Sequence, residues 1–213
     1  ALFDRRFRTL FLARDRYGIK PLYLLRDADG ISFASEIKAL IGAQRGSRHV
    51  NPTALLQYLH CEYSTGRDTL IRGIERLLPG EACLVRHGEI VQRWRYYAPP
   101  LAQRTLEQPA ALHDRFDALM ETVMRDHLRC DVPMGLFLSG GIDSTLLATL
   151  LREQLGAGVP SYSIGFASPE VHSELAAARS VAQACGMRHT ELTVTGDELL
   201  ASLPHAIWSA DEL

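Results

Sequence analysis

The sequence lacks any pairing of cysteines that would indicate a metal centre or a disulfide scaffold. Its 213 residues include only four cysteines, and they are widely spaced: Cys61, Cys83, Cys130 and Cys185. Because no two of them form a C-x-x-C pair, we expect neither a zinc knuckle nor a disulfide framework. Reduced, mostly structural thiols are typical of a cytoplasmic protein, and we predict that location.

Long apolar runs and a strong excess of one charge are also missing. No apolar stretch approaches the roughly 18–20 residues that a membrane-spanning helix requires. The formal net charge is −2, and 46% of the residues are hydrophobic. This balance excludes a general attraction to nucleic acid or to an anionic membrane, and we expect neither as a partner. The apolar content is enough for one large domain or two small ones.

The two ends of the chain lack the features of a complete protein. The first residue is Ala1 rather than methionine, no signal peptide follows it, and Leu213 ends the chain inside a helical pattern. We therefore expect a chain that is cut at both ends.

Residues 1–97 read as short strands separated by turns. A helix is expected over residues 51–60, because Asn51-Pro52 supplies an N-cap followed by proline at the first helical position. His87-Gly88 predicts a hairpin turn between two of the strands. The expected strands are residues 10–13, 22–25, 31–34, 81–86 and 89–95. This half of the chain is predicted to be an antiparallel α+β domain.

Residues 98–110 contain three prolines and are predicted to be a linker, and the pattern of apolar residues changes after them. From residue 111 onward, helices alternate with short apolar strands. The expected helices are residues 111–128, 144–155 and 174–185, and the expected strands are residues 132–138, 161–166 and 189–194. Such alternation predicts a parallel sheet with crossover helices, so residues 111–213 form a separate α/β domain.

The strongest chemical signal is Leu-Phe-Leu-Ser-Gly-Gly-Ile-Asp-Ser at residues 136–144, where a strand ends and a helix begins. Gly140 and Gly141 lack a Cβ, so backbone N–H groups can close on a phosphate oxygen, aided by the positive end of the helix dipole. Ser139 and Ser144 add hydroxyl donors. Asp143 would repel a bare phosphate, so its presence predicts a bridging divalent cation, most simply Mg²⁺.

Two alternatives accompany this interpretation. The segment is not a Walker P-loop, which needs a lysine, and it could be only a glycine-rich turn with a Ser or Asp cap. Ile164 and Gly165 end the next strand, where Ile164 could pack against adenine and Gly165 would let a flat ring approach the backbone. From spacing alone, an ordinary core strand explains these two residues better.

The loop and the segments before it resemble a known family. The S-G-G-x-D-S pattern resembles the pyrophosphate loop of ATP pyrophosphatases, which cleave ATP between the α and β phosphates. Residues 12–23 are similar to the A-R-D-x-x-G-x-K-P-L-Y segment of class II glutamine amidotransferases, although Arg14, Asp15 and Lys20 could instead form a surface ion-pair cluster. The segments that resemble asparagine synthetases are Phe33–Leu40, Ile74–Gly80, Asp131–Pro133 and Asp211–Glu212.

The resemblance to glutamine-hydrolysing asparagine synthetases implies a fold for each half. Residues 1–97 would be the C-terminal part of an N-terminal-nucleophile glutaminase domain, and residues 111–213 the first part of an ATP-pyrophosphatase domain. ATP with magnesium would activate the β-carboxylate of aspartate as an acyl adenylate, and ammonia released from glutamine would displace AMP. The substrates are thus small molecules, and the full-length protein could form a homodimer.

The same resemblance implies roles for individual residues. Asp143 and Ser139 would be catalytic, and Asp143 would be one of two metal ligands. The residues expected to bind the nucleotide are Leu138, Ser139, Gly140, Gly141, Asp143, Ser144, Ile164 and Gly165, with Leu138 and Ile164 against the adenosine.

Some family features are missing from the chain. The glutaminase nucleophile is an N-terminal cysteine that uses its own α-amino group as base, and no internal cysteine can replace it. A downstream S-G-E-G-x-D-E segment would lie beyond Leu213. We therefore expect this part alone to be inactive or weakly active. Glu174 could keep an acidic role that the family often has here, or Ser173 could simply cap the following helix.

Two other functions stay open at this point. A related carboxylate-adenylating enzyme, such as a β-lactam synthetase or a peptide cyclase, would use the same loop on another acceptor. Leu213 stands where the family has proline, which leaves the acceptor undecided. A truncated nucleotide-binding module without catalysis is the remaining alternative. The histidines His113, His127, His189 and His205 show no metal-binding spacing.

Overall fold

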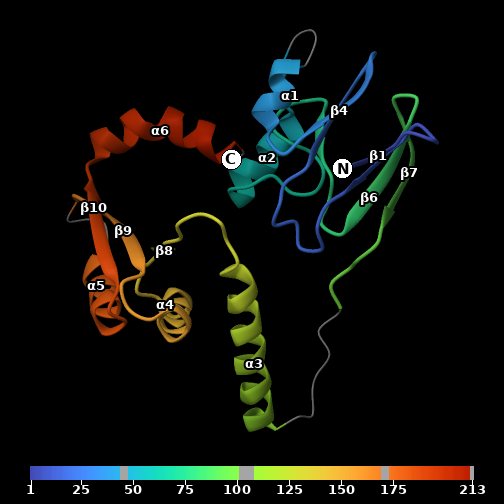
Figure 1. Ribbon diagram of the computed structural model, residues 1–213. Helices are drawn as coiled ribbons and strands as arrows, with labels where there is room; N and C mark the ends of the chain where they lie inside the picture. The colour runs from blue at the N-terminus through green and yellow to red at the C-terminus, as the bar shows by residue number, and fades with distance from the viewer. Residues whose placement is uncertain (44–47, 101–107, 169–172, 212–213) are drawn as a thin grey trace. The chain divides into compact units, whose positions relative to one another are not determined.

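The computed structural model describes residues 1–43, 48–100, 108–168 and 173–211, which divide into two compact units (Figure 1). The first unit comprises Ala1–Ala102 with Pro204–Leu213, and the second comprises Gln103–Leu203. The predicted mixture of antiparallel and parallel sheets is confirmed. Among the described residues, no helix is both long and apolar enough to cross a membrane.

The described part of the first unit contains two antiparallel sheets. One has the order β1-β2-β6-β7 and the other the order β4-β3-β5. The strands are β1 (Leu2–Asp4), β2 (Thr9–Ala13), β3 (Tyr23–Asp27), β4 (Gly30–Ala34), β5 (Ile74–Arg76), β6 (Glu81–Arg86) and β7 (Glu89–Arg95). The predicted strands 10–13, 22–25, 31–34, 81–86 and 89–95 are thus confirmed to within a few residues, whereas β1 and β5 were not predicted.

Strand β3 is the centre of this unit because both of its faces are buried. Leu24 packs with Leu12 of β2 in one apolar cluster, which joins the two sheets. Tyr23 and Leu25 point to the opposite face, as alternate residues of a strand must, and pack in a second cluster with α1 (Ile37–Ala43). The smaller sheet therefore lies between the larger sheet and α1.

Local sequence signals account for several turns of this unit. His87 and Gly88 have φ of 51° and 79°, and the flanking Arg86 and Glu89 pair across the hairpin. Two positive φ values give a turn whose twist matches that of the strands, and the predicted hairpin is confirmed. Asn51 caps α2 (Pro52–Cys61), since its Oδ1 accepts the N–H of Thr53 at 3.1 Å.

The segment at residues 14–20 is held by hydrogen bonds to backbone groups rather than by an ion-pair cluster. Asp15 accepts N–H groups from Ile19 and Lys20, each at 2.9 Å. The bond from the Lys20 N–H is the main reason that the pKa of Asp15 lies below its usual value. Arg14 in turn donates to the carbonyl oxygens of Gly18, at 2.8 Å, and Leu77, at 2.9 Å. These contacts fix a turn, so the ion-pair interpretation is wrong.

Helix α1 was not predicted, although Ile37, Leu40 and Ile41 lie at helical spacing. Its first N–H groups are satisfied from far along the chain. The carboxylate of Asp211 accepts the N–H groups of Ile37 and Lys38, the latter at 3.0 Å. Glu212, the partner of Asp211 in the family resemblance, lies outside the described residues.

In the second unit the described strands form a parallel sheet of order β10-β9-β8, as predicted. The strands are β8 (Leu136–Phe137), β9 (Pro160–Phe166) and β10 (Arg188–Val194), and the helices are α3 (Pro109–His127), α4 (Ile142–Leu155) and α5 (Leu175–Ala184). Helix α6 (Gly196–Ala210) begins in this unit, and its residues from Pro204 onward belong to the first unit. Leu138, Ala148 of α4, and Ala178 and Ala182 of α5 form the core beneath the sheet. The alanines let the two helices approach closely.

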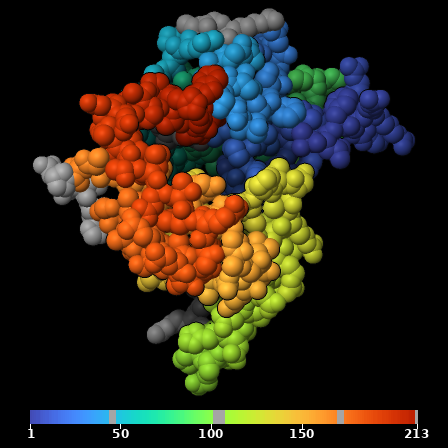
Figure 2. Space-filling model, turned by 60° about the vertical axis from the view of Figure 1, so that its left-hand side comes forward, coloured from blue at the N-terminus to red at the C-terminus, as the bar shows by residue number. Residues whose placement is uncertain are grey.

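Three expectations for this unit need correction. The strand predicted over residues 132–138 shrinks to Leu136–Phe137, because Pro133 has no N–H to contribute to a ladder. Helix α3 begins at Pro109, within the range expected as a linker, while residues 101–107 of that range lie outside the described part. Helix α6 was expected only as a helical pattern at the end of the chain, without bounds. Figure 2 shows the N-terminal half of α3, in light green, standing clear of the other elements of this unit, and only Met124 of this helix is buried.

All four cysteines are free thiols, as predicted. Cys83 and Cys185 are buried, and Cys61 and Cys130 are exposed. Burial raises the pKa of the Cys83 thiol above its usual value, so this side chain remains a protonated member of the core.

Candidate functional site

The segment after β8 is anchored to the neighbouring strand β9. The N–H of Leu138 donates to the carbonyl oxygen of Tyr162 at 2.9 Å, and the buried hydroxyl of Ser163 donates to the carbonyl oxygen of Leu138. The side chain of Leu138 is only 2% exposed and lies in the core with Ala148. The loop that follows therefore starts from a fixed point at the carboxyl end of the sheet, which is where open parallel sheets bind ligands.

Gly140 gives the loop a path that another residue could not follow. Its φ is +79°, and a Cβ at this position would lie 2.7 Å from the Cβ of Ala177 and from the N of Ala178 in α5. Only glycine combines this backbone conformation with such a close approach of two chain segments. The loop and the first turn of α5 are consequently in direct contact.

Two serine hydroxyls tie the loop to the start of α4. Ser139 Oγ lies 3.1 Å from Ser144 Oγ and accepts the N–H of Gly141 at 3.3 Å. Ser144 Oγ in turn lies 3.2 Å from the carbonyl oxygen of Gly141, to which it donates. The first bond inside α4 runs from the Thr145 N–H to that same oxygen, at 3.0 Å. The N–H groups of residues 142–144 are left without partners inside the helix, as at every helix N-terminus.

Asp143 gives the loop a negative charge, and Glu174 adds another in the wall of the adjoining cavity. Asp143 is exposed in the first turn of α4 and directly precedes Ser144 in the sequence. Among the described residues, no group of three His, Cys, Asp or Glu side chains comes together to hold a metal ion. A single carboxylate nevertheless fits Mg²⁺, which is commonly held by one or two carboxylates together with the phosphates of a substrate.

A cavity of about 220 Å³ lies next to the loop, at the ends of β8 and β9. The lining residues are Phe137, Leu138, Ser139, Tyr162, Ser163, Ile164, Glu174 and Leu175. Ile164 is 56% exposed and gives the cavity an apolar wall. The space is smaller than the roughly 300–1,000 Å³ typical of small-molecule pockets, so it suits one ring system rather than a whole nucleotide.

Gly165 makes room for a side chain of α5. A Cβ at Gly165 would fall 2.5 Å from Cδ1 of Leu175. The space that we expected to admit a flat ring is thus taken by Leu175, which itself lines the cavity. The N–H of Leu175 donates to Ser173 Oγ at 3.4 Å, while the side chain of Glu174 caps nothing and lines the cavity. His172 lies outside the described residues.

Sequence reasoning missed Leu175 and Tyr162 as lining residues. The alternation in β9 contained the signal for Tyr162, since Tyr162 and Ile164 share one face of the strand. Leu175 could not be found in this way, because its place depends on how α5 packs on the sheet.

Comparisons with known proteins agree with this geometry. The family described as asparagine synthase matches residues 115–213, and the glutamine amidotransferase domain matches residues 1–97. A putative glutamine-hydrolyzing asparagine synthetase of Mycobacterium tuberculosis is 36% identical over 218 aligned positions, which cover 100% of this chain and 33% of that protein. The chain belongs to the asparagine synthetase family.

Two further relatives have lower identity to this chain. Glutamine-hydrolyzing asparagine synthetase 1 of Bacillus subtilis is 29% identical across 99% of this chain and 33% of its own length. Amidase chyE of Penicillium rubens is 28% identical, also across 99% of this chain and 33% of its own length. The chain thus spans about a third of the length of the curated relatives that it matches.

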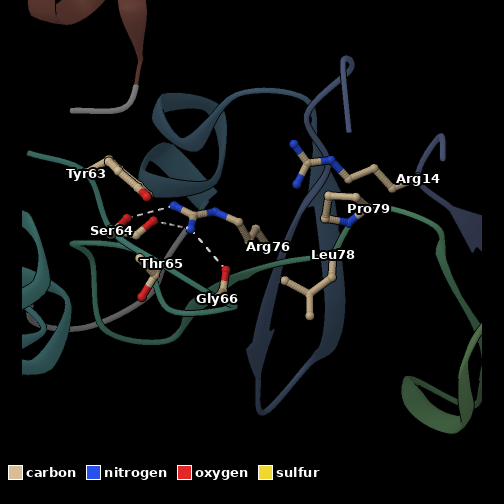
Figure 3. Close-up of a pocket in the computed structure, with 8 residues that line it drawn as sticks. All are labelled: Arg14, Tyr63, Ser64, Thr65, Gly66, Arg76, Leu78 and Pro79. Carbon is tan, nitrogen blue, oxygen red and sulfur yellow. Dashed lines mark hydrogen bonds between the residues drawn. The ribbon is translucent and has the colours of Figure 1, made fainter. Parts of the chain in front are cut away.

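The part that matches the glutamine amidotransferase family holds a second cavity, of about 490 Å³ (Figure 3). Its polar contacts hold the backbone together. Arg76 donates to the carbonyl oxygens of Ser64, at 2.8 Å, and Gly66, at 3.0 Å. Burial lowers the pKa of Arg76 from its usual value, and the nearby Tyr23 opposes that shift. Arg14 lines the opposite side, where its own bonds fix residues 18–20 and Leu77.

Proposed function

We propose that the full-length protein converts aspartate to asparagine with ATP, through a β-aspartyl-AMP intermediate and with ammonia released from glutamine. The observation that carries this proposal is the Ser139–Ser144 loop, in which a glycine pair, two linked hydroxyls and a helix N-terminus converge beside one carboxylate. The presence of an amidotransferase match and a synthase match in one chain supports the same conclusion.

The N–H groups at the start of α4 would hold the β and γ phosphates of ATP. This geometry pairs the positive end of the helix with an anion, and Gly140 and Gly141 allow the backbone to approach the phosphates closely. Ser139 and Ser144 already contact each other at 3.1 Å. Each hydroxyl would have to rotate its single hydrogen away from these internal partners to donate to a phosphate oxygen, a small movement that leaves the serine backbone in place.

Asp143 would hold Mg²⁺ from the exposed first turn of α4. When bound, the ion neutralises charge that develops on the pyrophosphate as it leaves. Asp143 without a cation would repel the same phosphates, so the carboxylate makes ATP binding depend on the metal.

The apolar wall made by Ile164 and Tyr162 would receive the adenine ring. Both side chains lie on the exposed face of β9, beside the cavity. Because the side chain of Leu138 is buried, this residue would contact the adenosine through its backbone rather than through its methyl groups. Gly165 would act indirectly, by admitting Leu175 to the cavity wall.

We also propose a domain assignment and a location. Residues 1–97 would be the C-terminal part of an N-terminal-nucleophile glutaminase domain, residues 98–108 a linker, and residues 109–213, which start with α3, the first part of an ATP-pyrophosphatase domain. Four free thiols support a cytoplasmic location. A homodimer of the full-length protein stays a prediction.

A second candidate is amide formation on a different carboxylate. The similarity to amidase chyE of Penicillium rubens favours keeping it, because that relative aligns across the same two matched regions. The loop chemistry is common to both candidates, and only the acceptor differs.

The test uses the full-length protein with ATP, Mg²⁺, aspartate and either glutamine or ammonia. Mass spectrometry should detect asparagine, and the Asp143→Asn variant should lower its rate at least about 100-fold through loss of the metal ligand. A wild-type protein that adenylates other carboxylates but leaves aspartate unchanged would favour the second candidate. Unchanged activity in Asp143→Asn would refute the role of the loop.

A further inference from the structure

Helix α5 forms one wall of the loop without being part of it. Ala177 faces Gly140, and Leu175 faces Gly165, in both cases with less space than a Cβ needs. Because there is no free space between either glycine and α5, a small displacement of this helix would change the loop and the cavity together. The position of this helix must be fixed by contacts elsewhere.

The apolar contacts of α5 set its distance from the core but leave its orientation weakly defined. Its buried residues are the alanines Ala178 and Ala182, which are small and smooth. At its N-terminus the Leu175 N–H donates to Ser173 Oγ at 3.4 Å, Glu174 makes no capping bond with its side chain, and the first turn has no acidic residue. Among the described residues, the end of the helix nearest the cavity is thus held locally by a long hydrogen bond rather than by a strong cap.

A polar contact supplies the missing restraint one turn further along. Arg179 Nε donates to Glu191 Oε1 at 2.8 Å, and Arg179 Nη2 donates to Glu191 Oε2 at 2.6 Å. This two-point contact between a guanidinium and a carboxylate fixes angle as well as distance. It joins α5 directly to strand β10.

The β10 end of this contact is itself held in place. His189 lies on the same face of β10 as Glu191, and its Nε2 is 3.5 Å from Glu191 Oε1. The imidazole is only 10% exposed, and among the described residues its Nε2 has no hydrogen-bond partner. Its Nδ1 lies 2.9 Å from the hydroxyl of Ser161, a fully buried residue of β9. Glu191 therefore lies against an imidazole that is itself fixed within the sheet.

We propose that Arg179 and Glu191 are positioning residues for ATP: by fixing α5 on β10, they hold Ala177 and Leu175 against the two glycines and so shape the phosphate loop and the cavity. Neither residue lines the cavity. This inference rests on the proposed function only in that the loop binds ATP, and it does not depend on the acceptor.

The test measures the Kd of ATP with Mg²⁺ for the full-length protein, by equilibrium dialysis, in Arg179→Ala, Glu191→Gln and the double variant. Each single variant should weaken ATP binding roughly 2- to 30-fold, the range found for residues that act on a site indirectly. The double variant should be no weaker than the worse single variant, because both act through one contact. Since Arg179 is 54% exposed, the melting temperature should change little.

Glu121→Gln is the matched control. It removes the charge from an exposed contact on α3, in which Arg125 donates to Glu121 at 2.5 Å and the arginine is 59% exposed, close to the 54% of Arg179. The Kd of ATP should then stay within about twofold of the wild type. Single variants that keep the wild-type Kd would overturn the inference, and so would additive effects in the double variant. If the wild-type protein binds ATP but makes no asparagine, the proposed function is refuted, whereas the Kd values of the variants still decide whether Arg179 and Glu191 position the ATP site.

Discussion

Gly140→Ala is the substitution whose cost follows most directly from the geometry. An alanine at φ +79° costs about 1–2 kcal/mol because its Cβ crowds its own backbone. The new Cβ would also lie 2.7 Å from Ala177 and Ala178 of α5. Those are backbone atoms and a Cβ that cannot swing aside, and overpacking of this kind costs about 1–3 kcal/mol more.

The expected total is at least about 2 kcal/mol, which corresponds to roughly 30-fold in ATP affinity if the loop yields rather than the helix. The assay is pyrophosphate release by the full-length protein at varied ATP concentration, with the melting temperature measured alongside. We expect kcat/KM for ATP to fall by that factor or more.

Gly156→Ala is the control that distinguishes the effect of backbone strain from the effect of the steric clash with α5. Gly156 ends α4 with φ +80°, and a Cβ there would meet nothing within 4 Å. This variant should lose stability through strain but keep its kcat/KM for ATP. If Gly140→Ala lowered kcat/KM no more than Gly156→Ala does, the contact between loop and α5 would not matter for the nucleotide, and the reasoning would be refuted.

Three further predictions concern the first unit and the loop. Glu81→Ala should lower the free energy of unfolding by about 3 kcal/mol, because Glu81 is buried and paired with Arg67. Burial alone would raise the pKa of Glu81, but the hydrogen bonds from Arg67 hold this pKa below 4.5. The contribution of Glu81 to the free energy of unfolding is therefore present above that pH and is lost in stronger acid. Urea unfolding should show a smaller stability difference between wild type and Glu81→Gln at pH 3 than at pH 7. Asn51→Ala should cost about 1 kcal/mol in the same assay through loss of the α2 cap, and an unchanged midpoint would contradict that role. Ser139→Ala should raise KM for ATP by about 10-fold or more, as expected for one lost hydrogen bond to a charged group, with a normal melting temperature as its control.

Local signals were sufficient to predict much of the fold. The hairpin at His87-Gly88 and the cap at Asn51 each depend on a few neighbouring residues, and both are confirmed. The parallel sheet of the second unit followed from alternating helices and strands. The predictions missed β1, β5 and α1, which are short and depend on pairing or packing with distant segments. They also overestimated one strand: the strand expected over residues 132–138 keeps only Leu136 and Phe137, because tertiary pairing decides how far a strand extends.

The loop of the candidate site could be predicted from the sequence, but the residues that line the cavity and hold α5 in place could not. The order of residue types at 139–144 is enough to predict a phosphate-binding loop, and the structure brings the serine and glycine residues of this segment together. The role of Gly165 depends on Leu175 across a helix-sheet contact, which no local pattern encodes. Arg179 and Glu191 are 12 residues apart in the chain and become partners only through the packing of α5.

The most direct measurement is the identity of the nucleotide product, followed by phosphorus NMR with full-length protein, ATP, Mg²⁺, aspartate and ammonia. A loop that holds the β and γ phosphates while the α phosphate is attacked should yield AMP and pyrophosphate in equal amounts, and only when aspartate is present. Formation of ADP and inorganic phosphate instead would contradict the account.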